Sequence, residues 1–395
     1  MKTKVLTIGF LIIVFLLAGL NVKTDMKALK PVYQKYIQGK SIEKVESVND
    51  AIDKIESVFN DEFALKYSFI EVNGLTKRTM GNWESNERIK LPGGYLVQST
   101  EPVDMNAKAE SMAGLKDYLE EQGIEFLYIA LPNKVEPGKS ELRPGIETSS
   151  NANVDALLKG IDKGGVTYYD LREDLASGYE AAGYGSWQSA FFKTDHHWLP
   201  QTAFWAYTDI AKRLQADYGF AVDERSMDIN NYRIETYEDR FLGSSGRRTG
   251  ICYGGLDDFS LIIPEFETDM SFEAPVEGIK RSGEYEKVFF EKKFLEKDYF
   301  EVDTFNTYTG GHDLCMQRND GAVNDKKLLV VKDSYTLALQ PYYSFMFREV
   351  DVIDLRYYEK ETLKEYVDRT QPDMVIMEYS PGQMGEKKLF KYGLD

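Results

Sequence analysis

The clearest indication of the fold lies in residues 328–335, which read LLVVKDSY. The four apolar residues at its start predict a buried strand, since short continuous apolar runs are typical of sheets covered on both faces. Asp333 and Ser334 follow the strand, and a helical pattern continues from Tyr335. A serine in such a strand-to-helix turn is lifted clear of the sheet, where its hydroxyl can act as a nucleophile. The alternative is that Asp333 and Ser334 only cap the helix.

The same alternation of helix and strand continues on both sides of this stretch. Apolar residues at spacings of three and four predict helices, and short apolar runs predict strands. Predicted strands are 124–130, 166–169, 328–331, 350–355 and 374–377; predicted helices begin near 108 and after Pro200 and cover 154–161, 335–347 and 361–369. Strands that alternate with helices predict an α/β fold, a parallel sheet with helices on both faces.

Residues from about 217 to 327 break this rhythm. They are rich in Gly, Asp and Glu and contain possible short strands at 287–290 and 299–302. We therefore expect one domain over residues 61–395, with an irregular β-containing insertion at about 217–327.

The first residues predict an export signal. Lys2 and Lys4 precede an apolar run from Val5 to Leu20, which is short for a membrane-spanning helix but suits a secretory signal. No clear small-residue cleavage site follows, which favours an uncleaved anchor over a removed peptide. Residues 1–24 are thus predicted to be a signal anchor or signal peptide, and 25–60 a helical stalk. The domain is then expected outside the cytoplasm, anchored to the cell membrane or secreted if the signal is cleaved.

The composition narrows the range of partners. The chain has 395 residues and a formal net charge of −17, without a block of basic residues long enough to follow a nucleic-acid backbone. Nucleic acid is therefore not an expected partner. An acidic protein also repels polyanions at long range, so a polyanionic substrate would need a locally basic cleft. Cys252 and Cys315 are the only cysteines, and either a disulfide or two packed thiols fits their spacing.

Two of the three histidines are adjacent in the sequence Thr194-Asp195-His196-His197-Trp198. In an extended segment alternate side chains share a face, so Asp195 and His197 are expected to converge and His196 to point away. Asp195 would then orient the imidazole that accepts the proton of Ser334. One alternative is that Asp195 caps the helix after Pro200. Another is a metal-dependent phosphoesterase, but such sites need more ligands than the one remaining histidine, His312, supplies.

These motifs resemble the bacterial DHHW proteins, which are relatives of the SGNH-hydrolase-like proteins that O-acetylate alginate and other exopolysaccharides. The resemblance extends from about residue 60 to 380. It rests on Asp195-His196-His197-Trp198, Lys332-Asp333-Ser334-Tyr335 and the stretch 243–250, with further matches at 131–134, 257–259 and 352–357. It implies an SGNH-like fold in which Ser334, His197 and Asp195 form the catalytic triad.

One departure from the family pattern concerns the serine motif, in which Lys332 stands in place of a glycine. The oxyanion-binding Gly and Asn of the family therefore have only candidate positions here, Asn133 and the pair Gly310 and Gly311. The basic residues Lys134, Arg247 and Arg248 are candidates for binding an anionic sugar or the acyl donor.

The resemblance implies an extracytoplasmic O-acetyltransferase that modifies a cell-surface or secreted polysaccharide through an acyl-serine, without a cofactor or a metal. The implied acetyl donor is a membrane-bound O-acyltransferase, since free acyl-coenzyme A is absent outside the cell. Two alternatives remain open. Water instead of a sugar would make the protein a carbohydrate acetyl esterase, and loss of the chemistry would leave a glycan-binding or scaffold protein.

Overall fold

The computed structural model describes residues 63, 65–178, 180–181 and 183–394, and the single positions 8, 11, 12, 15, 16, 19, 21 and 30. The chain divides into two compact units, Met1–Asn73 and Gly74–Asp395. Most of the predicted anchor and stalk, and the boundary at residue 60, lie outside the described residues. Within the described part of the chain, no helix is long and apolar enough to cross a membrane.

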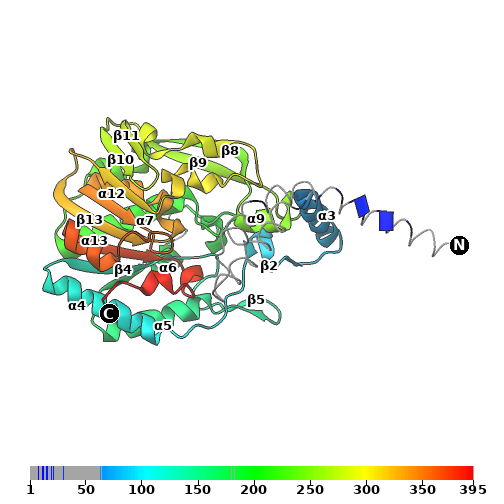
Figure 1. The fold of residues 1–395 in the computed structure, drawn as a ribbon, viewed down its shortest axis with the longest axis horizontal. Helices are drawn as coiled ribbons and strands as arrows, with labels where there is room; N and C mark the ends of the chain where they lie inside the picture. Colours follow the sequence, from blue (N-terminus) through cyan, green and yellow to red (C-terminus); the bar gives the residue numbers. More distant parts are fainter. Residues whose placement is uncertain are drawn as a thin grey trace. The chain divides into compact units, whose positions relative to one another are not determined.

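An eight-stranded sheet forms the centre of the larger unit (Figure 1). Its strands are β4 (Glu125–Ala130), β7 (Tyr168–Asp170), β10 (Met270–Ala274), β11 (Ile279–Gly283), β12 (Leu314–Arg318), β13 (Asn324–Lys332), β14 (Phe347–Ile353) and β15 (Met374–Tyr379). They lie in the order β11-β10-β12-β14-β13-β15-β4-β7. The strands from β14 to β7 are parallel, whereas β12, β10 and β11 pair antiparallel at one side. The predicted α/β fold with a mainly parallel sheet is confirmed.

Helices cover both faces of this sheet. The longer ones are α4 (Asn106–Glu121), α5 (Ser150–Lys163), α6 (Leu171–Gly178), α7 (Pro200–Tyr218), α12 (Gln340–Met346) and α13 (Leu363–Thr370). Apolar residues of α6, α7 and α12 belong to one core cluster, and those of α4, α5 and α13 belong to a second. Figure 1 shows α4 and α5 side by side along one face of the sheet.

The alternation of side chains along each strand explains why the parallel strands read as continuous apolar runs. In β4, Leu127 and Ile129 enter one core cluster, whereas Phe126 and Tyr128 enter the other. Because successive side chains of a strand point to opposite faces, a strand covered on both sides is apolar at most of its positions. Burial of each such side chain stabilises the fold by roughly 1.5–3 kcal/mol.

The structure contains further helices and strands besides the central sheet and the helices that cover it. They include α3 (Lys66–Thr79), α8 (Glu224–Met227), α9 (Ser244–Thr249), α10 (Ile251–Gly254), α11 (Tyr285–Phe289), β1 (Glu84–Ser85), β2 (Arg88–Lys90), β3 (Leu96–Val97), β5 (Glu141–Arg143), β6 (Ile146–Glu147), β8 (Tyr232–Phe241) and β9 (Asp257–Pro264). Strands β1 to β3, β5 with β6, and β8 with β9 form small sheets apart from the central one.

The segment 217–327 consists of two parts. Strands β8 and β9 form an antiparallel pair of their own, whereas β10, β11 and β12 extend the central sheet through the pairing of β12 with β14. The possible strands at 287–290 and 299–302 are wrong. Residues 285–289 form α11, in which Tyr285, Val288 and Phe289 are buried at helical spacing, and residues 299–302 lie in a turn region.

Cys252 and Cys315 are both thiols, which is the second of the two alternatives that the sequence left open. Cys315 is buried in β12, and burial raises the pKa of its thiol to about 12. This thiol is therefore protonated at neutral pH and packs as a small apolar side chain.

Candidate active site

Ser334 occupies the turn between β13 and the following 3₁₀ helix, Ser334–Ala338. Asp333 is the N-cap of that helix, because its carboxylate accepts a hydrogen bond from the N–H of Tyr335 at 2.9 Å. The other carboxylate oxygen of Asp333 accepts from the N–H and the hydroxyl of Ser380, at 2.7 and 2.8 Å, just beyond β15. Asp333 thus provides the cap and holds two strand ends together, which leaves the side chain of Ser334 available.

The segment that carries the histidines is a tight loop closed by a bridge between Phe191 and Trp198. The indole Nε1 of Trp198 donates a hydrogen bond to the carbonyl oxygen of Tyr335 at 3.0 Å. This bond joins the histidine loop directly to the turn that carries Ser334. The helix α7 after this loop has Leu199 as its N-cap residue, so Asp195 does not cap it.

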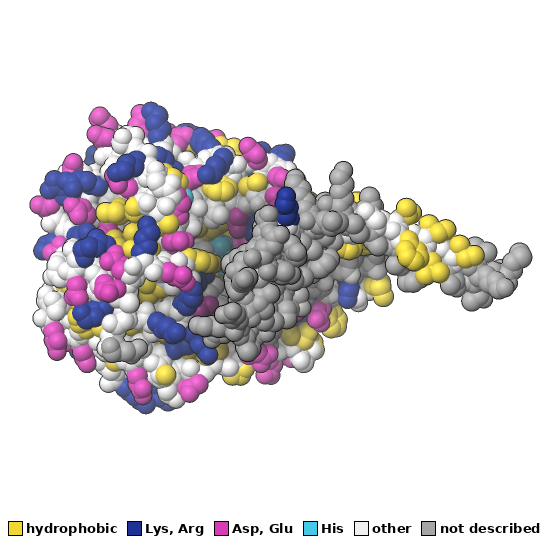
Figure 2. All heavy atoms as spheres, viewed as in Figure 1, with side chains coloured by type: hydrophobic (Ala, Val, Ile, Leu, Met, Phe, Trp, Pro, Cys, Tyr) yellow, Lys and Arg dark blue, Asp and Glu magenta, His cyan; other side chains and the backbone are white. Residues whose placement is uncertain are grey.

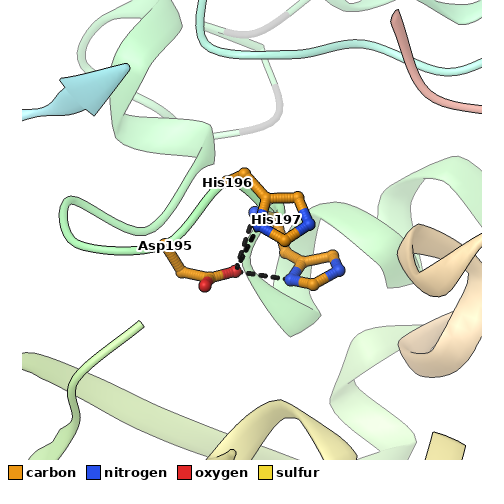
Figure 3. Close-up of side chains that lie close together, drawn as sticks. All are labelled: Asp195, His196 and His197. Carbon is orange, nitrogen blue, oxygen red and sulfur yellow. Dashed lines mark hydrogen bonds and ion pairs between the residues drawn. The ribbon is translucent and has the colours of Figure 1, made fainter. Parts of the chain in front are cut away.

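The structure brings Asp195, His197 and Ser334 into one line of hydrogen bonds. His197 contacts a carboxylate oxygen of Asp195 through Nδ1 (Figure 3), and its Nε2 lies 2.9 Å from the hydroxyl oxygen of Ser334. Asp195 and His197 are 1% and 4% exposed. The ring of Phe305 stacks on the His197 imidazole at 3.9 Å between centroids and 8° between planes, and so fixes the orientation of the imidazole.

Hydrogen bonds and nearby imidazoles keep Asp195 ionised. Burial opposes the charged form, but His196, His197 and the N–H of Ser244 together hold the pKa of this carboxyl well below its usual value. The Ser244 N–H donates to the second carboxylate oxygen at 2.6 Å. Because an ionised carboxylate only accepts, we assign the imidazole hydrogen to Nδ1 of His197. Nε2 then accepts from the Ser334 hydroxyl, as a general base must.

The stretch 243–250 supports Asp195 from the opposite side. Gly243 approaches so closely that a Cβ at this position would lie 2.1 Å from the Asp195 Cβ. Only glycine permits this approach, which places the Ser244 N–H on the carboxylate. The N–H of Gly246 also donates to the Thr194 carbonyl oxygen at 2.8 Å. The sequence indicated this glycine-rich stretch by resemblance, but not its contact with Asp195.

His196 does not point away from His197, and the expectation based on strand alternation is wrong. Residues 193–197 form successive bends instead of a strand, and the two rings lie 3.8 Å apart between centroids. His196 still differs from His197 in exposure and in its hydrogen bond. Its side chain is 46% exposed, and its Nδ1 lies 2.9 Å from the Ser244 hydroxyl. Desolvation by the surrounding chain and the nearby His197 lower the pKa of His196, so its imidazole is neutral at pH 7.

Asp195, His196 and His197 also offer ligand atoms within 4.8 Å of one another, a spacing that a metal ion can use. However, both oxygens of Asp195 already accept hydrogen bonds, and both ring nitrogens of His197 have partners. No further Asp, Glu, His or Cys within the described chain joins this group. The arrangement therefore fits proton transfer to and from Ser334 better than the several-ligand sites of metal-dependent phosphoesterases.

A cavity of about 510 Å³ lies beside this hydrogen-bonded line. Its wall includes His196 and Tyr335, which adjoin His197 and Ser334 in the chain, and Asn133, Lys134 and Arg248 from the predicted binding residues. The other lining residues are Arg88, Leu96, Val97, Gln98, Ser99, Thr100, Glu101, Val135, Ser244, Ser245, Ser380, Gly382 and Gln383. Arg88 and the segment 96–101 belong to a part of the chain in which the sequence indicated no chemistry.

The predicted binding residues differ in how far their polar groups are engaged. The ammonium of Lys134 is buried and donates to the carbonyl oxygens of Leu96 and Lys193 at 2.7 and 3.0 Å. Burial lowers the pKa of Lys134 to about 8. The amide oxygen of Asn133 accepts from the N–H of Val135 at 2.9 Å. Both side chains therefore brace the cavity wall.

The other three candidates lie in different surroundings. Arg247 forms an ion pair with Asp303 at 2.8 Å, whereas Arg248 lines the cavity. Gly310 lies against Glu291 and His312, and Gly311 lies against Asn306. Neither glycine is among the residues that line the cavity.

Comparison with known proteins found one matching family model and several similar structures. The family model described as an SGNH hydrolase-like domain, acetyltransferase AlgX, matches residues 93–239, which include Asp195 and His197. The fold is similar to that of Bacillus cereus PatB1, with a TM-score of 0.63, 20% identity and coverage of 77% of this chain and 99% of that chain. It is also similar to a DHHW family protein from Eubacterium siraeum, with a TM-score of 0.55, 17% identity and coverage of 78% and 95%. None of the curated proteins matches the chain.

The fold is therefore that of an SGNH-hydrolase-like domain, as the sequence motifs predicted. Residues 93–239 are similar to the acetyltransferase AlgX, and the fold is similar to that of a DHHW family protein.

Proposed function

We propose that this protein is an O-acetyltransferase that transfers an acetyl group to a polysaccharide through an acyl-serine on Ser334. The observation that carries the proposal is the position of His197, whose Nε2 lies 2.9 Å from the Ser334 hydroxyl while its Nδ1 contacts Asp195. The relation to the acetyltransferase AlgX favours acyl transfer as the chemistry of this serine.

The first half-reaction acylates the serine. As the Ser334 oxygen attacks the acetyl carbonyl carbon, its proton moves to Nε2 of His197, and Asp195 stabilises the imidazolium that forms. The negative charge that develops on the carbonyl oxygen is expected near the N–H of Ser334, since the first N–H groups of a helix have no partner within it. Collapse of this intermediate breaks the bond to the leaving group, which takes the proton from His197.

The second half-reaction regenerates the enzyme. A sugar hydroxyl gives its proton to His197 Nε2 and attacks the acyl-serine carbonyl carbon; the Ser334 oxygen then leaves and regains a proton from His197. Water in place of the sugar would give acetate and make the protein an esterase. Transfer therefore requires a site that holds a sugar next to Ser334, and the adjacent cavity of about 510 Å³ is large enough for sugar units.

We also place the enzyme outside the cytoplasm, held at the membrane by its N-terminal segment. The support is the sequence, in which Lys2 and Lys4 precede the apolar run from Val5 to Leu20. A membrane-bound O-acyltransferase is the proposed acetyl donor for this location. Fusion of residues 1–60 to a phosphatase that folds only outside the cytoplasm tests the location, and an inactive fusion would contradict it.

The reaction is tested with the full chain, an acetyl ester and an acceptor oligosaccharide. Mass spectrometry should find an acetyl group on the peptide that contains Ser334, and acetyl groups on the oligosaccharide. Ser334→Ala should lose both products. The matched control is Ser177→Ala, which removes an exposed hydroxyl on α6 and should keep both. Acetate release without sugar acetylation would identify an esterase, and full turnover by Ser334→Ala would refute the nucleophile.

A further inference from the structure

The cavity beside Ser334 has a wall that is richer in positive than in negative charge. Arg88, Lys134 and Arg248 line it, whereas Glu101 is its one acidic lining residue. The protein as a whole is acidic, with a formal net charge of −17. Figure 2 shows acidic and basic side chains mixed over the visible face of the molecule. The cavity wall therefore differs in charge from the surface as a whole.

Arg88 is a buried cation held by neutral partners. It is 6% exposed, its Nε donates to the Ser245 hydroxyl at 3.2 Å, and its Nη1 donates to the Glu87 carbonyl oxygen at 3.2 Å. Burial and the nearby Arg248 lower the pKa of Arg88. Among the residues that the structure describes, no carboxylate forms an ion pair with Arg88 or Arg248.

The neighbouring Arg247 differs from Arg88 and Arg248 because a carboxylate forms an ion pair with it, whereas Glu87 acts electrostatically on Arg88 without an ion pair between them. Arg247 precedes Arg248 on α9, and its guanidinium forms an ion pair with Asp303 at 2.8 Å and also donates to the Val302 carbonyl oxygen. One residue further on, Arg248 lies on the cavity wall near a second guanidinium. Arg88 is buried, so its charge is costly there without an ion-pair partner, and the exposed Arg248 on the same cavity wall adds a second positive charge. An anion between them would remove that cost.

We propose that Arg88 and Arg248 form an acceptor subsite that binds an oxyanion, a carboxylate or a phosphate ester, carried by the glycan that Ser334 acetylates. The inference rests on the proposed function for the identity of the acceptor. Guanidinium groups suit both oxyanions, because their planar N–H groups donate two parallel hydrogen bonds to either.

The proposed subsite lies on the same cavity wall as residues next to Ser334, so a bound anion would position the acceptor for the reaction. His196, Ser244 and Tyr335 lie on the same wall and adjoin Asp195, His197 and Ser334 in the chain or by hydrogen bonds. An anionic group held at Arg88 and Arg248 would therefore keep a neighbouring sugar unit next to the acyl-serine and displace water. The local positive charge also offsets the long-range repulsion between an acidic protein and a polyanion.

The test measures binding without turnover. The full chain with Ser334→Ala is titrated calorimetrically with three oligomers of equal length: a uronic-acid oligosaccharide, a glycerol-phosphate oligomer and a neutral glucan. We expect at least one anionic oligomer to bind at least tenfold more tightly than the neutral one at low salt, and the difference to shrink as salt rises. The two anionic arms decide whether carboxylate or phosphate is the natural group.

Substitutions at Arg248 and Arg88 test whether the anionic oligomers bind at the proposed subsite. Added to Ser334→Ala, Arg248→Gln should weaken anionic binding about tenfold, the effect of losing one charge-assisted contact. Arg88→Lys keeps a cation at the buried position but loses the fork of donors, and should weaken it as well. The control is Arg233→Gln, which removes the same charge from the exposed surface of β8 and should change nothing.

Equal binding of the neutral and anionic oligomers, or equal weakening by Arg233→Gln and Arg248→Gln, would overturn the subsite. Such a result leaves the proposed acetyl transfer intact, because transfer is judged by acetylated product from the unmodified enzyme. Conversely, specific anion binding without any acetyl transfer would leave the subsite standing and refute the proposed function.

Discussion

His197 and His312 are both buried and each contacts a buried carboxylate, but the first of these pairs also has the hydroxyl of Ser334 beside it. His197 lies between Asp195 and the hydroxyl of Ser334. His312 contacts Glu291 through Nε2 at 3.0 Å. Both imidazoles are largely buried, at 4% and 9% exposure, so burial and a carboxylate partner do not distinguish them.

The difference lies in what else each pair contacts. Glu291 also pairs with Arg281 at 3.2 Å and Lys293 at 2.6 Å, and the second nitrogen of His312 faces Glu277 at 3.5 Å. The charge of Glu291 is thus shared among several cations, and His312 has a carboxylate on each side. Asp195, in contrast, contacts the two imidazoles and the N–H of Ser244, and among the described residues it forms no ion pair with a Lys or Arg. A carboxylate and imidazole become catalytic through the group on the far nitrogen.

The largest expected effect is loss of activity on changing Asp195, His197 or Ser334. Ser334→Ala and His197→Ala should each lower kcat for a small acetyl ester by about 10³-fold or more, and the double variant should lose little further, because the residues act as a unit. Asp195→Asn should cost about as much by favouring the wrong imidazole tautomer. Circular dichroism checks that the variants fold. His312→Ala is the matched histidine control, and a comparable loss there would break the distinction between the two pairs.

A third buried carboxylate, that of Glu378, extends the comparison because it accepts hydrogen bonds from hydroxyl groups and not from an imidazole. Glu378 is fully buried in β15, where it accepts hydrogen bonds from Tyr343 and from Thr336, the latter at 2.7 Å. Burial raises the pKa of Glu378 to about 7 from 4.5. The folded state therefore holds a proton that the unfolded state releases, so this stabilising contribution is complete below pH 4.5 and is lost as pH rises to 7.

Glu378→Gln should remove that pH dependence. Between pH 4.5 and 7 the free energy of unfolding of the unchanged protein should fall by at most about 3 kcal/mol from this group, at about 1.4 kcal/mol per pKa unit. The variant should show a correspondingly smaller fall. Urea unfolding curves at pH 5 and pH 8 measure both proteins. Parallel falls in the two would show that Glu378 titrates normally in the folded state.

A smaller effect is expected at the second pair, and on stability instead of catalysis. The hydrogen bond from His312, and then Lys293 and Arg281, lower the pKa of Glu291 to about 2 from 4.5 against the opposing effect of burial. This contribution is present above pH 4.5 and is lost as pH falls toward 2. Glu291→Gln should lower the free energy of unfolding by about 1–2 kcal/mol at pH 7, since Lys293 is largely exposed and screened.

The free energy of unfolding at acid pH provides the check for Glu291. Urea unfolding at pH 7 and pH 3 should show a smaller acid-induced loss in Glu291→Gln than in the unchanged protein, while hydrolysis of the acetyl ester stays within about threefold, under about 0.7 kcal/mol. A loss of kcat as large as that of His197→Ala would mean that both pairs serve catalysis.

The smallest effect should come from His196, which shares the loop but not the line of hydrogen bonds. His196→Ala removes the contact with the Ser244 hydroxyl and one side of the cavity wall. We expect KM for a glycan acceptor to rise by a few-fold, about 1 kcal/mol or less, with kcat nearly unchanged. Steady-state kinetics of His196→Ala and His197→Ala, measured in parallel, test this expectation. A loss of kcat in His196→Ala equal to that in His197→Ala would contradict it.

Much of the central sheet was predictable because its information is local. The runs at 328–331 and 374–377 are apolar at every position, and the run at 124–130 at every position except Glu125; the parallel strands β4, β13 and β15 are found there. The edge of the sheet was not predictable in this way. Strands β10 and β11 show only mixed burial, so their sequences lack the apolar signature, and the apolar residues of α11 resemble a strand when read alone.

The candidate site shows the same difference between features that are encoded locally and features that are not. Asp195, His197 and Ser334 were predicted from motifs, and the structure brings their side chains together. The groups that orient them were not found: Phe305 stacks on His197 from a separate 3₁₀ helix, and the Ser244 N–H reaches Asp195 from α9. A backbone N–H has no signature in the sequence, and an isolated Phe is more often a core residue.

The sequence by itself determined the order of the helices and parallel strands and the chemical types at the strand-to-helix turn, because hydrophobic periodicity and helix capping act over a few residues. Only the tertiary structure decided that the His196 imidazole packs against that of His197, since residues 193–197 bend where an extended segment was expected. It also decided that Arg247 forms an ion pair with Asp303 while Arg248 lines the same cavity as Arg88. Such pairings join residues far apart in the chain. Their charge balance depends on distances and burial, which are established only once helices have packed on both faces of the sheet.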